Sequence, residues 1–183
     1  MKSKILGFTL IELIVVIAII GLLSSVLFAS FDEARKQSRD KVRMATLKEM
    51  QLAIELYKAQ HGQYPAAGCA SENNIFYGPG PVNGVIPNLS TCDNYIAGLV
   101  PDFIASLPRD PRFENDNNRG FYYRSDGNSY KLMIRQSVET LLINDWSDEF
   151  ARCPSQAVNG QCSAVLVPPS QTYAVYSPGA EHW

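Results

Sequence analysis

The sequence predicts an α+β fold in which one long N-terminal helix packs on a small antiparallel β-sheet. Three observations support this prediction. Residues 8–31 form an apolar run in which Glu12 is the only ionisable side chain. The following residues keep a helical spacing of apolar side chains, with no glycine before Gly62 and no proline before Pro65. Beyond that point, alternating strand patterns and loops rich in Gly, Pro and Asn replace the helical pattern.

The apolar run 8–31 predicts a membrane-spanning helix. Its 24 residues exceed the roughly 20 that cross about 30 Å of hydrocarbon. It is too long for the apolar core of a cleavable secretory signal, and no A-x-A cleavage site follows it. A carboxylate at the bilayer centre costs roughly 2.5–3.5 kcal/mol. Some further feature of the chain is therefore expected to make the cost of Glu12 worthwhile.

Residues 32–61 predict an amphipathic continuation of the same helix. One apolar stripe recurs at spacings of 3, 4 and 3 residues: Leu47, Met50, Ile54 and Tyr57. A second apolar set lies beside this stripe and consists of Ala45, Leu52, Leu56 and Ala59. The opposite side of the helix carries the charged residues Lys48, Glu49, Glu55 and Lys58. Such a helix requires a domain that covers its apolar face. A continuous helix from residue 8 to 60 would be about 80 Å long.

The remaining residues, 62–183, predict a globular head. Residues 62–98 are expected to form a long loop, and 95–111 a short helix or turn. The clearest strand signal is the Asp126–Gly127 dipeptide between two alternating runs, which is typical of a β-hairpin. In the second run, Tyr130, Leu132 and Ile134 share one face, and Lys131, Met133 and Arg135 share the other. The segments SAVLV and TYAVYS add one or two strands.

Charge and cysteine content narrow the function classes. A formal net charge of −2 gives no electrostatic case for a nucleic-acid surface. The four cysteines are Cys69, Cys92, Cys153 and Cys162. They form no CxxC pair, so a zinc site is not expected. In an exported domain they predict two disulfides, and of three possible pairings Cys69–Cys92 with Cys153–Cys162 closes the shortest loops. The alternative is that the four cysteines are reduced thiols in a cytosolic domain. The basic residues after residue 31 favour an orientation with this domain in the cytoplasm, because positively charged flanks of membrane helices tend to stay there.

The stretch KILGFTLIELIVVIAIIGLL resembles the class III signal of type IV pilins and type II secretion pseudopilins. The resemblance extends over about the first 65 residues, to HGQYP, and is looser beyond them. It implies a pilin-like fold with a cleaved leader at 1–7, a transmembrane and assembly helix at 8–31, an amphipathic helix at 32–61 and a head at 62–183. It also implies that a prepilin peptidase cleaves between Gly7 and Phe8 and N-methylates Phe8. Glu12 would then meet the N-terminal ammonium of a neighbouring subunit during assembly.

The resemblance implies a structural subunit of a pilus-like or secretion-like filament. The expected partners are further copies of the chain and other pilins, the prepilin peptidase, and an assembly platform in the inner membrane. The precursor would be a single-pass membrane protein with its head outside the cytoplasm, and the product a cell-surface or periplasmic filament. No nucleophile–base arrangement points to an enzyme. The alternative is a membrane-anchored extracytoplasmic binding domain that does not polymerise and whose binding could depend on calcium.

One candidate metal site accompanies these predictions. Asp110, Asp116 and Asp126 lie in oxygen-rich loops of the kind that hold calcium. Their spacing does not satisfy the EF-hand pattern, but major pseudopilins bind calcium in a loop near their strands. A solvated acidic loop is the competing interpretation, and no other cofactor is expected.

Overall fold

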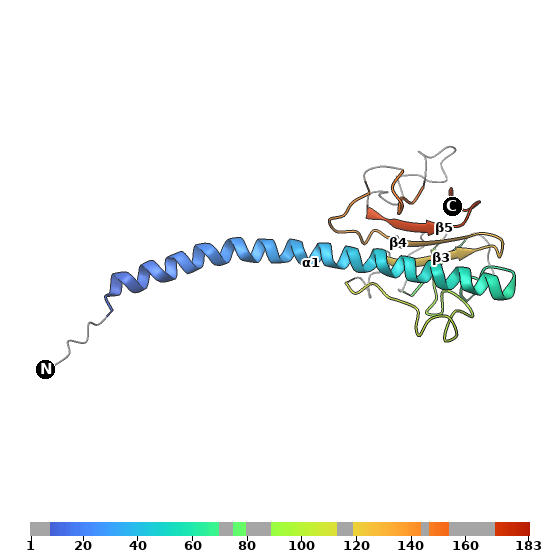
Figure 1. Cartoon of the computed structure of the whole chain (residues 1–183), viewed down its shortest axis with the longest axis horizontal. Coiled ribbons are helices and arrows are strands. Elements are labelled where there is room, and N and C mark those ends of the chain that lie inside the picture. The colour runs from blue at the N-terminus through green and yellow to red at the C-terminus, as the bar shows by residue number, and fades with distance from the viewer. Residues whose placement is uncertain (1–7, 70–74, 80–88, 113–118, 144–146, 154–170) are drawn as a thin grey trace.

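The computed structural model describes residues 8–69, 75–79, 89–112, 119–143, 147–153 and 171–183. Within these ranges the chain forms the helix α1 (Leu10–His61) and the strands β1 (Phe76–Gly78), β2 (Leu89–Thr91), β3 (Gly120–Ser125), β4 (Tyr130–Arg135) and β5 (Tyr173–Tyr176). Figure 1 shows the C-terminal half of α1 lying along the sheet, while its N-terminal half projects away from the head. The predicted α+β class, with a long helix packed on a small sheet, is confirmed.

The helix α1 is continuous over 52 residues. No residue between its ends breaks it, because proline is absent and Gly21 is an isolated glycine. It ends at Gly62, which adopts a left-handed conformation (φ 78°) and donates its N–H to the carbonyl of Lys58 at 2.8 Å. A residue with a Cβ is strained at such a φ, so the glycine determines where the helix ends.

The sheet has the strand order β2-β1-β3-β4-β5, and it is antiparallel except for the β1–β2 pair. The predicted hairpin is confirmed: Ser125 pairs with Tyr130, and Asp126 Oδ1 accepts the N–H groups of Asn128 (2.9 Å) and Ser129 (2.7 Å). The segment TYAVYS supplies β5, as predicted, whereas SAVLV lies outside the described residues.

The expectation of an uninterrupted loop over 62–98 is wrong, because β1 and β2 lie within it. Each strand has only three residues, which is too short to show an alternating pattern. Both strands gain their stability from pairing, since β1 is held between β2 and β3. The segment 95–111 forms turns and contains no helix.

The main core lies between α1 and one face of the sheet. Leu47, Met50 and Ile54 are buried, as the first helical stripe predicts. They pack with sheet residues of the same core: Phe121, Tyr123, Tyr130, Leu132, Ile134, Tyr173 and Val175. Full burial of one such apolar side chain stabilises the fold by roughly 1.5–3 kcal/mol. The other face carries a smaller cluster of Phe76, Tyr122, Met133 and Ala174.

The predicted disulfide Cys69–Cys92 is confirmed, and its Cα atoms lie 5.7 Å apart. It joins the segment after the helix to the residue that follows β2. Cys153 is also disulfide-bonded, and its predicted partner, Cys162, lies outside the described residues.

Candidate assembly surface on the N-terminal helix

The first turn of α1 is closed by a reciprocal capping box between Thr9 and Glu12. Thr9 Oγ1 accepts the backbone N–H of Glu12 at 3.3 Å. In return, Glu12 Oε2 accepts the backbone N–H of Thr9 at 2.9 Å and the Thr9 hydroxyl at 2.7 Å. Two of the N–H groups that every helix leaves unpaired at its start are thereby satisfied.

The single chain therefore gives Glu12 a local partner that the sequence interpretation missed. The signal was present, because Thr9 and Glu12 form the T-x-x-E pattern of a capping box immediately before an apolar run. The carboxylate faces the start of the helix, beside Phe8. Gly7, on the other side of the predicted cleavage bond, lies outside the described residues.

The N-terminal half of α1 exposes most of its described apolar side chains in the single chain. Phe8 is 84% exposed and Leu10 is 75% exposed. The other large apolar side chains that remain exposed on this half are Ile11, Leu13, Ile14, Val15, Val16, Ile17, Ile19, Ile20, Leu22, Leu23, Phe28 and Phe31. An exposed apolar patch of this extent marks a protein–protein or membrane contact surface.

The predicted transmembrane helix is not confirmed. Among the described residues, no helix combines the length and apolarity needed to cross a bilayer.

The second apolar set of the helix also remains outside the core. Leu52 is 62% exposed and Leu56 is 48% exposed, and Ala45 and Ala59 are exposed as well. Val42 continues the same stripe toward the N-terminus and is exposed too. The head thus covers one apolar face of the helix and leaves the neighbouring one open, which extends the apolar surface of the N-terminal half.

A buried cluster of charged side chains connects the helix to the head, at the point where the N-terminal half of the helix leaves the head. Arg43 donates Nε and Nη2 to the two carboxylate oxygens of Asp110, at 2.7 and 2.9 Å. Its Nη1 contacts Asp40 at 2.8 Å and Glu139 at 2.9 Å. The side chains of Arg43, Asp40 and Asp110 are fully buried. Arg39 adds a bidentate pair with Glu139, both contacts at 2.7 Å.

Asp40 links the cluster to the segment after β4. Its carboxylate accepts the backbone N–H groups of Glu139, Thr140 and Leu141, at 2.7–3.1 Å. Burial opposes the charge on Arg43, yet its hydrogen bonds to Asp110, Glu139 and Asp40 raise its pKa above the ordinary value. The hydrogen bond from Arg39, with a further one from Arg43, lowers the pKa of Glu139 to about 2. Arg43 and Glu139 therefore stay charged at neutral pH.

The candidate calcium ligands are not brought together by the described structure. Asp110 binds Arg43 through both carboxylate oxygens, and Asp126 closes the β3–β4 turn. Asp116 lies outside the described residues. Within the described ranges, no group of three or more His, Cys, Asp or Glu side chains is arranged to hold a metal. Calcium binding stays a prediction.

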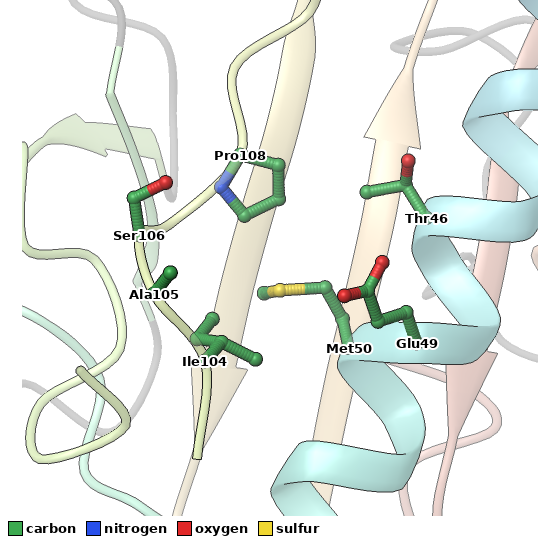
Figure 2. A pocket seen from close by; sticks show the side chains of 7 residues that line it. All are labelled: Thr46, Glu49, Met50, Ile104, Ala105, Ser106 and Pro108. Atoms are coloured by element: carbon green, nitrogen blue, oxygen red, sulfur yellow. The ribbon is translucent and has the colours of Figure 1, made fainter. Parts of the chain in front are cut away.

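A cleft of about 280 Å³ lies between the helix and the segment 104–108 (Figure 2). Its apolar lining consists of Met50, Ile104, Ala105 and Pro108. Glu49, Thr46 and Ser106 supply polar atoms around it. Glu49 belongs to the exposed side of the helix, so the cleft opens beside the second apolar stripe rather than within the core.

Comparisons with known proteins match the N-terminal segment. The family model for the prokaryotic N-terminal methylation motif matches residues 2–28. The type IV wide pilus major component PilA4 of Thermus thermophilus is 43% identical over 58 residues, which are 32% of this chain and 44% of that protein. A fimbrial protein of Neisseria meningitidis serogroup A is 37% identical over 75 residues, which are 38% of this chain and 43% of that protein.

The chain thus spans less than half the length of these curated relatives. No solved structure matches the chain. The matched segment contains Gly7, Phe8 and Glu12 and extends into the helix that projects from the head. With the methylation motif and the two pilin relatives, the resemblance to the type IV pilins is confirmed, and it is the N-terminal segment of the chain that carries it.

Proposed function

We propose that this chain is the precursor of a structural subunit of a type IV pilus-like or type II secretion-like filament. In this proposal a prepilin peptidase cleaves between Gly7 and Phe8 and methylates Phe8. The main support is that residues 10–28 of the segment that matches the methylation motif lie in the N-terminal half of α1, where the described apolar side chains are mostly exposed. The subunit polymerises through this half, and its role is structural rather than enzymatic.

The proposed division of the chain follows the distribution of exposed apolar surface. Residues 1–7 are the leader, and 8–31 form the membrane and assembly helix of the precursor. Residues 32–61 are the amphipathic part, whose buried stripe joins the helix to the head at 62–183. In the filament, the uncovered halves of several copies pack together, and the heads form the outer surface. Burial of the exposed stripes provides the driving force for this packing.

Glu12 has two successive partners in this proposal. In the single chain its carboxylate closes the capping box with Thr9. After cleavage, Phe8 carries a positive terminus, and the neighbouring Glu12 of another subunit pairs with it in the low-dielectric filament interior. The pairing is supported by an apolar recess beside Glu12, which is lined by Phe8, Ile11, Glu12, Val15 and Val16.

The proposed partners are other copies of the chain, other pilins, the peptidase and an inner-membrane assembly platform. The precursor is anchored in the membrane with its head outside the cytoplasm, and the filament is periplasmic or on the cell surface. The disulfides support this location, because they persist in oxidising compartments.

Mass spectrometry of the chain from a bacterial host that expresses a prepilin peptidase tests the processing step. The expected product begins at Phe8 and carries one N-terminal methyl group, whereas a host without the peptidase yields the uncut chain. Electron microscopy of the same cells tests assembly. A chain that keeps its leader in both hosts contradicts the proposal. A processed chain that forms no filaments favours the alternative, a membrane-anchored binding domain.

A further inference from the structure

Residues 178–183, which we call the closing segment, fold back over the sheet face that points away from α1. β5 ends at Tyr176, and the chain continues as two turns. In these turns Ala180 donates its N–H to the carbonyl of Ser177 (3.1 Å), and Trp183 donates to that of Ala180 (3.2 Å). Ala180 is fully buried, and Trp183 packs against the smaller apolar cluster. The closing segment is therefore a cover over that cluster.

Lys131 of β4 lies beneath the closing segment. It is 0% exposed, and its amine donates to the main-chain carbonyls of Glu181 at 2.9 Å and Trp183 at 3.1 Å. Lys131 pairs with Arg124 of β3 on one side and with Tyr176 of β5 on the other, so the three side chains form a row on one face of the sheet. Both acceptors belong to the closing segment. Lifting that segment would therefore remove them and admit water to the amine.

Other contacts of the closing segment are also made by polar side chains of the sheet. The guanidinium of Arg124 lies 4.1 Å from the centre of the Trp183 ring, a cation–π contact. Ser129 Oγ donates to the carbonyl of Pro178 at 3.0 Å. Segments held in this way open locally at a lower cost than strands in the core of a sheet.

The charged and titratable groups around Lys131 favour its neutral form. Burial is the main cause that lowers its pKa, to about 7, and the charges of Arg152 and Arg124 act in the same direction. The carboxylate of Glu181 acts in the opposite direction without cancelling the shift. The Tyr176 ring lies 4.9 Å from the amine, and burial raises the pKa of its hydroxyl, which therefore stays neutral. Since burial dominates, the shift depends on the closing segment being in place.

We propose that the closing segment is a pH-sensitive strap, which is fastened over the sheet when Lys131 is neutral and loosened when Lys131 is protonated. A neutral amine still has two hydrogens for the carbonyls of Glu181 and Trp183, and its burial does not incur the cost of desolvating a charge. Opening moves the amine into water, where it binds a proton again. The inference is independent of filament assembly.

The direction of the pH dependence follows from the two pKa values of Lys131. The pKa is about 7 with the strap closed and returns toward the ordinary value of 10.5 when the strap opens. Closing therefore releases a proton between these values, so closure strengthens as pH rises above 7 and is weakest, and independent of pH, below 7. Opening exposes part of the apolar cluster that Trp183 covers.

Hydrogen exchange of the full chain in non-ionic detergent tests the strap. Exchange of a peptide that contains residues 178–183 is measured from pH 6 to pH 9 and corrected for the intrinsic rate at each pH. In the unmodified chain, protection should be constant up to about pH 7 and then rise by about tenfold per pH unit, because closing releases one proton.

Two variants serve as the comparison for hydrogen exchange. Lys131→Met keeps a long side chain that does not titrate, so its protection should not change with pH. Lys41→Met removes an exposed lysine of the helix and should behave like the unmodified chain. Protection that is independent of pH in the unmodified chain, or that changes equally in Lys131→Met, overturns the proposal.

Acetylation of lysines provides a second readout, which stands even where Lys131→Met does not fold. An amine reacts only when it is neutral and accessible, so Lys131 reacts through the opened strap. As pH rises, the opened amine is more often neutral, but the strap opens less often. The acetylation rate of Lys131 should therefore rise to about pH 7 and stay level above it, whereas that of exposed Lys41 should keep rising to pH 9.

Trp183→Ala tests whether the strap controls access to Lys131. It removes the stacking on Arg124 and should raise the acetylation rate of Lys131 at pH 9 several-fold, without changing that of Lys41. A pH profile of Lys131 that follows that of Lys41, or equal rates for Lys131 in Trp183→Ala and in the unmodified chain, overturns the proposal.

Discussion

Arg43 of the helix and Asp110 of the head form a fully buried, bidentate ion pair, with Nε–Oδ2 at 2.7 Å and Nη2–Oδ1 at 2.9 Å. The two residues are 67 positions apart in the chain. Arg43 lies at the N-terminal end of the part of α1 that the head buries, before Leu47, Met50 and Ile54. The helix is thus held to the head by charge at this end and by apolar packing further along.

Replacing Arg43 tests how much the helix depends on this pair. Arg43→Met leaves Asp40 and Asp110 buried without their cation, which typically costs about 3–5 kcal/mol of unfolding free energy. Urea unfolding of the unmodified and variant chains measures the change. Lys48→Met is the matched control, because its pair with Glu149 is exposed and should contribute about 1 kcal/mol or less. Equal losses in the two variants would contradict the assigned role of Arg43.

Acid should weaken the same attachment. The pKa of Glu139 is lowered from 4.5 to about 2 by its hydrogen bonds from Arg39 and Arg43. Because the folded-state pKa lies below the unfolded one, the stabilisation is complete above about pH 4.5 and is lost as pH falls toward 2. Unfolding free energy measured from pH 6 to pH 2 should fall less steeply in Glu139→Gln. Parallel curves would show that Glu139 does not contribute to the acid response.

The disulfide Cys69–Cys92 should stabilise the segment between the helix and β3. The two cysteines are separated by 23 residues in the sequence. Removing a disulfide of this kind typically lowers the free energy of unfolding by about 2–4 kcal/mol. The double variant Cys69→Ser/Cys92→Ser should unfold at lower denaturant concentration by that amount. Peptide mapping without reductant should also recover Cys153 linked to Cys162. A peptide that links Cys69 to any residue but Cys92 would contradict the pairing.

The sequence predicted the parts of the fold that periodicity controls. The spacing of Leu47, Met50 and Ile54 identified the buried face of the helix, and the Asp126–Gly127 dipeptide identified the hairpin. The strands β1 and β2 were missed because their three residues gain order only from pairing with neighbours. Loop composition alone does not reveal such pairing.

The buried charges were missed for a related reason. Asp40 and Arg43 stand in a run of charged residues that resembles the solvated flank of a membrane helix. Their burial depends on Asp110 and Glu139, which are distant in the chain and come close only in the folded head. At the candidate site, Glu12 was identified from the apolar run around it. Its local partner Thr9 was missed because the capping pattern coincides with the family motif.

The exposed stripe of α1 should serve assembly rather than subunit stability. Leu52→Gln changes a residue that is 62% exposed, so the unfolding free energy should change by about 0.5 kcal/mol or less. Filament yield should nevertheless fall, because a buried contact between copies is weakened. Leu47→Ala, in the buried stripe, should instead destabilise the subunit by about 2–5 kcal/mol. Normal filament yield from Leu52→Gln would exclude this part of the stripe from the proposed interface.

Glu12→Gln distinguishes capping from charge at the start of the helix. A glutamine can replace the glutamate of a capping box, since its side-chain oxygen still accepts the N–H of Thr9. It cannot pair as an anion with the positive N-terminus of a neighbour. We therefore expect Glu12→Gln to be cleaved and methylated normally but to assemble several-fold less filament. Glu12→Ala removes both functions and should assemble no better.

Thr9→Ala is the matched control for these variants. It removes the hydroxyl that caps the helix but keeps the carboxylate of Glu12. Losing such a cap costs about 0.5–2 kcal/mol of helix stability, while the charge needed for docking remains. Thr9→Ala should thus assemble better than Glu12→Gln when filament yield is compared at equal amounts of processed subunit. The reverse order would mean that Glu12 acts through the helix cap, and the proposed pairing with a neighbouring N-terminus would be wrong.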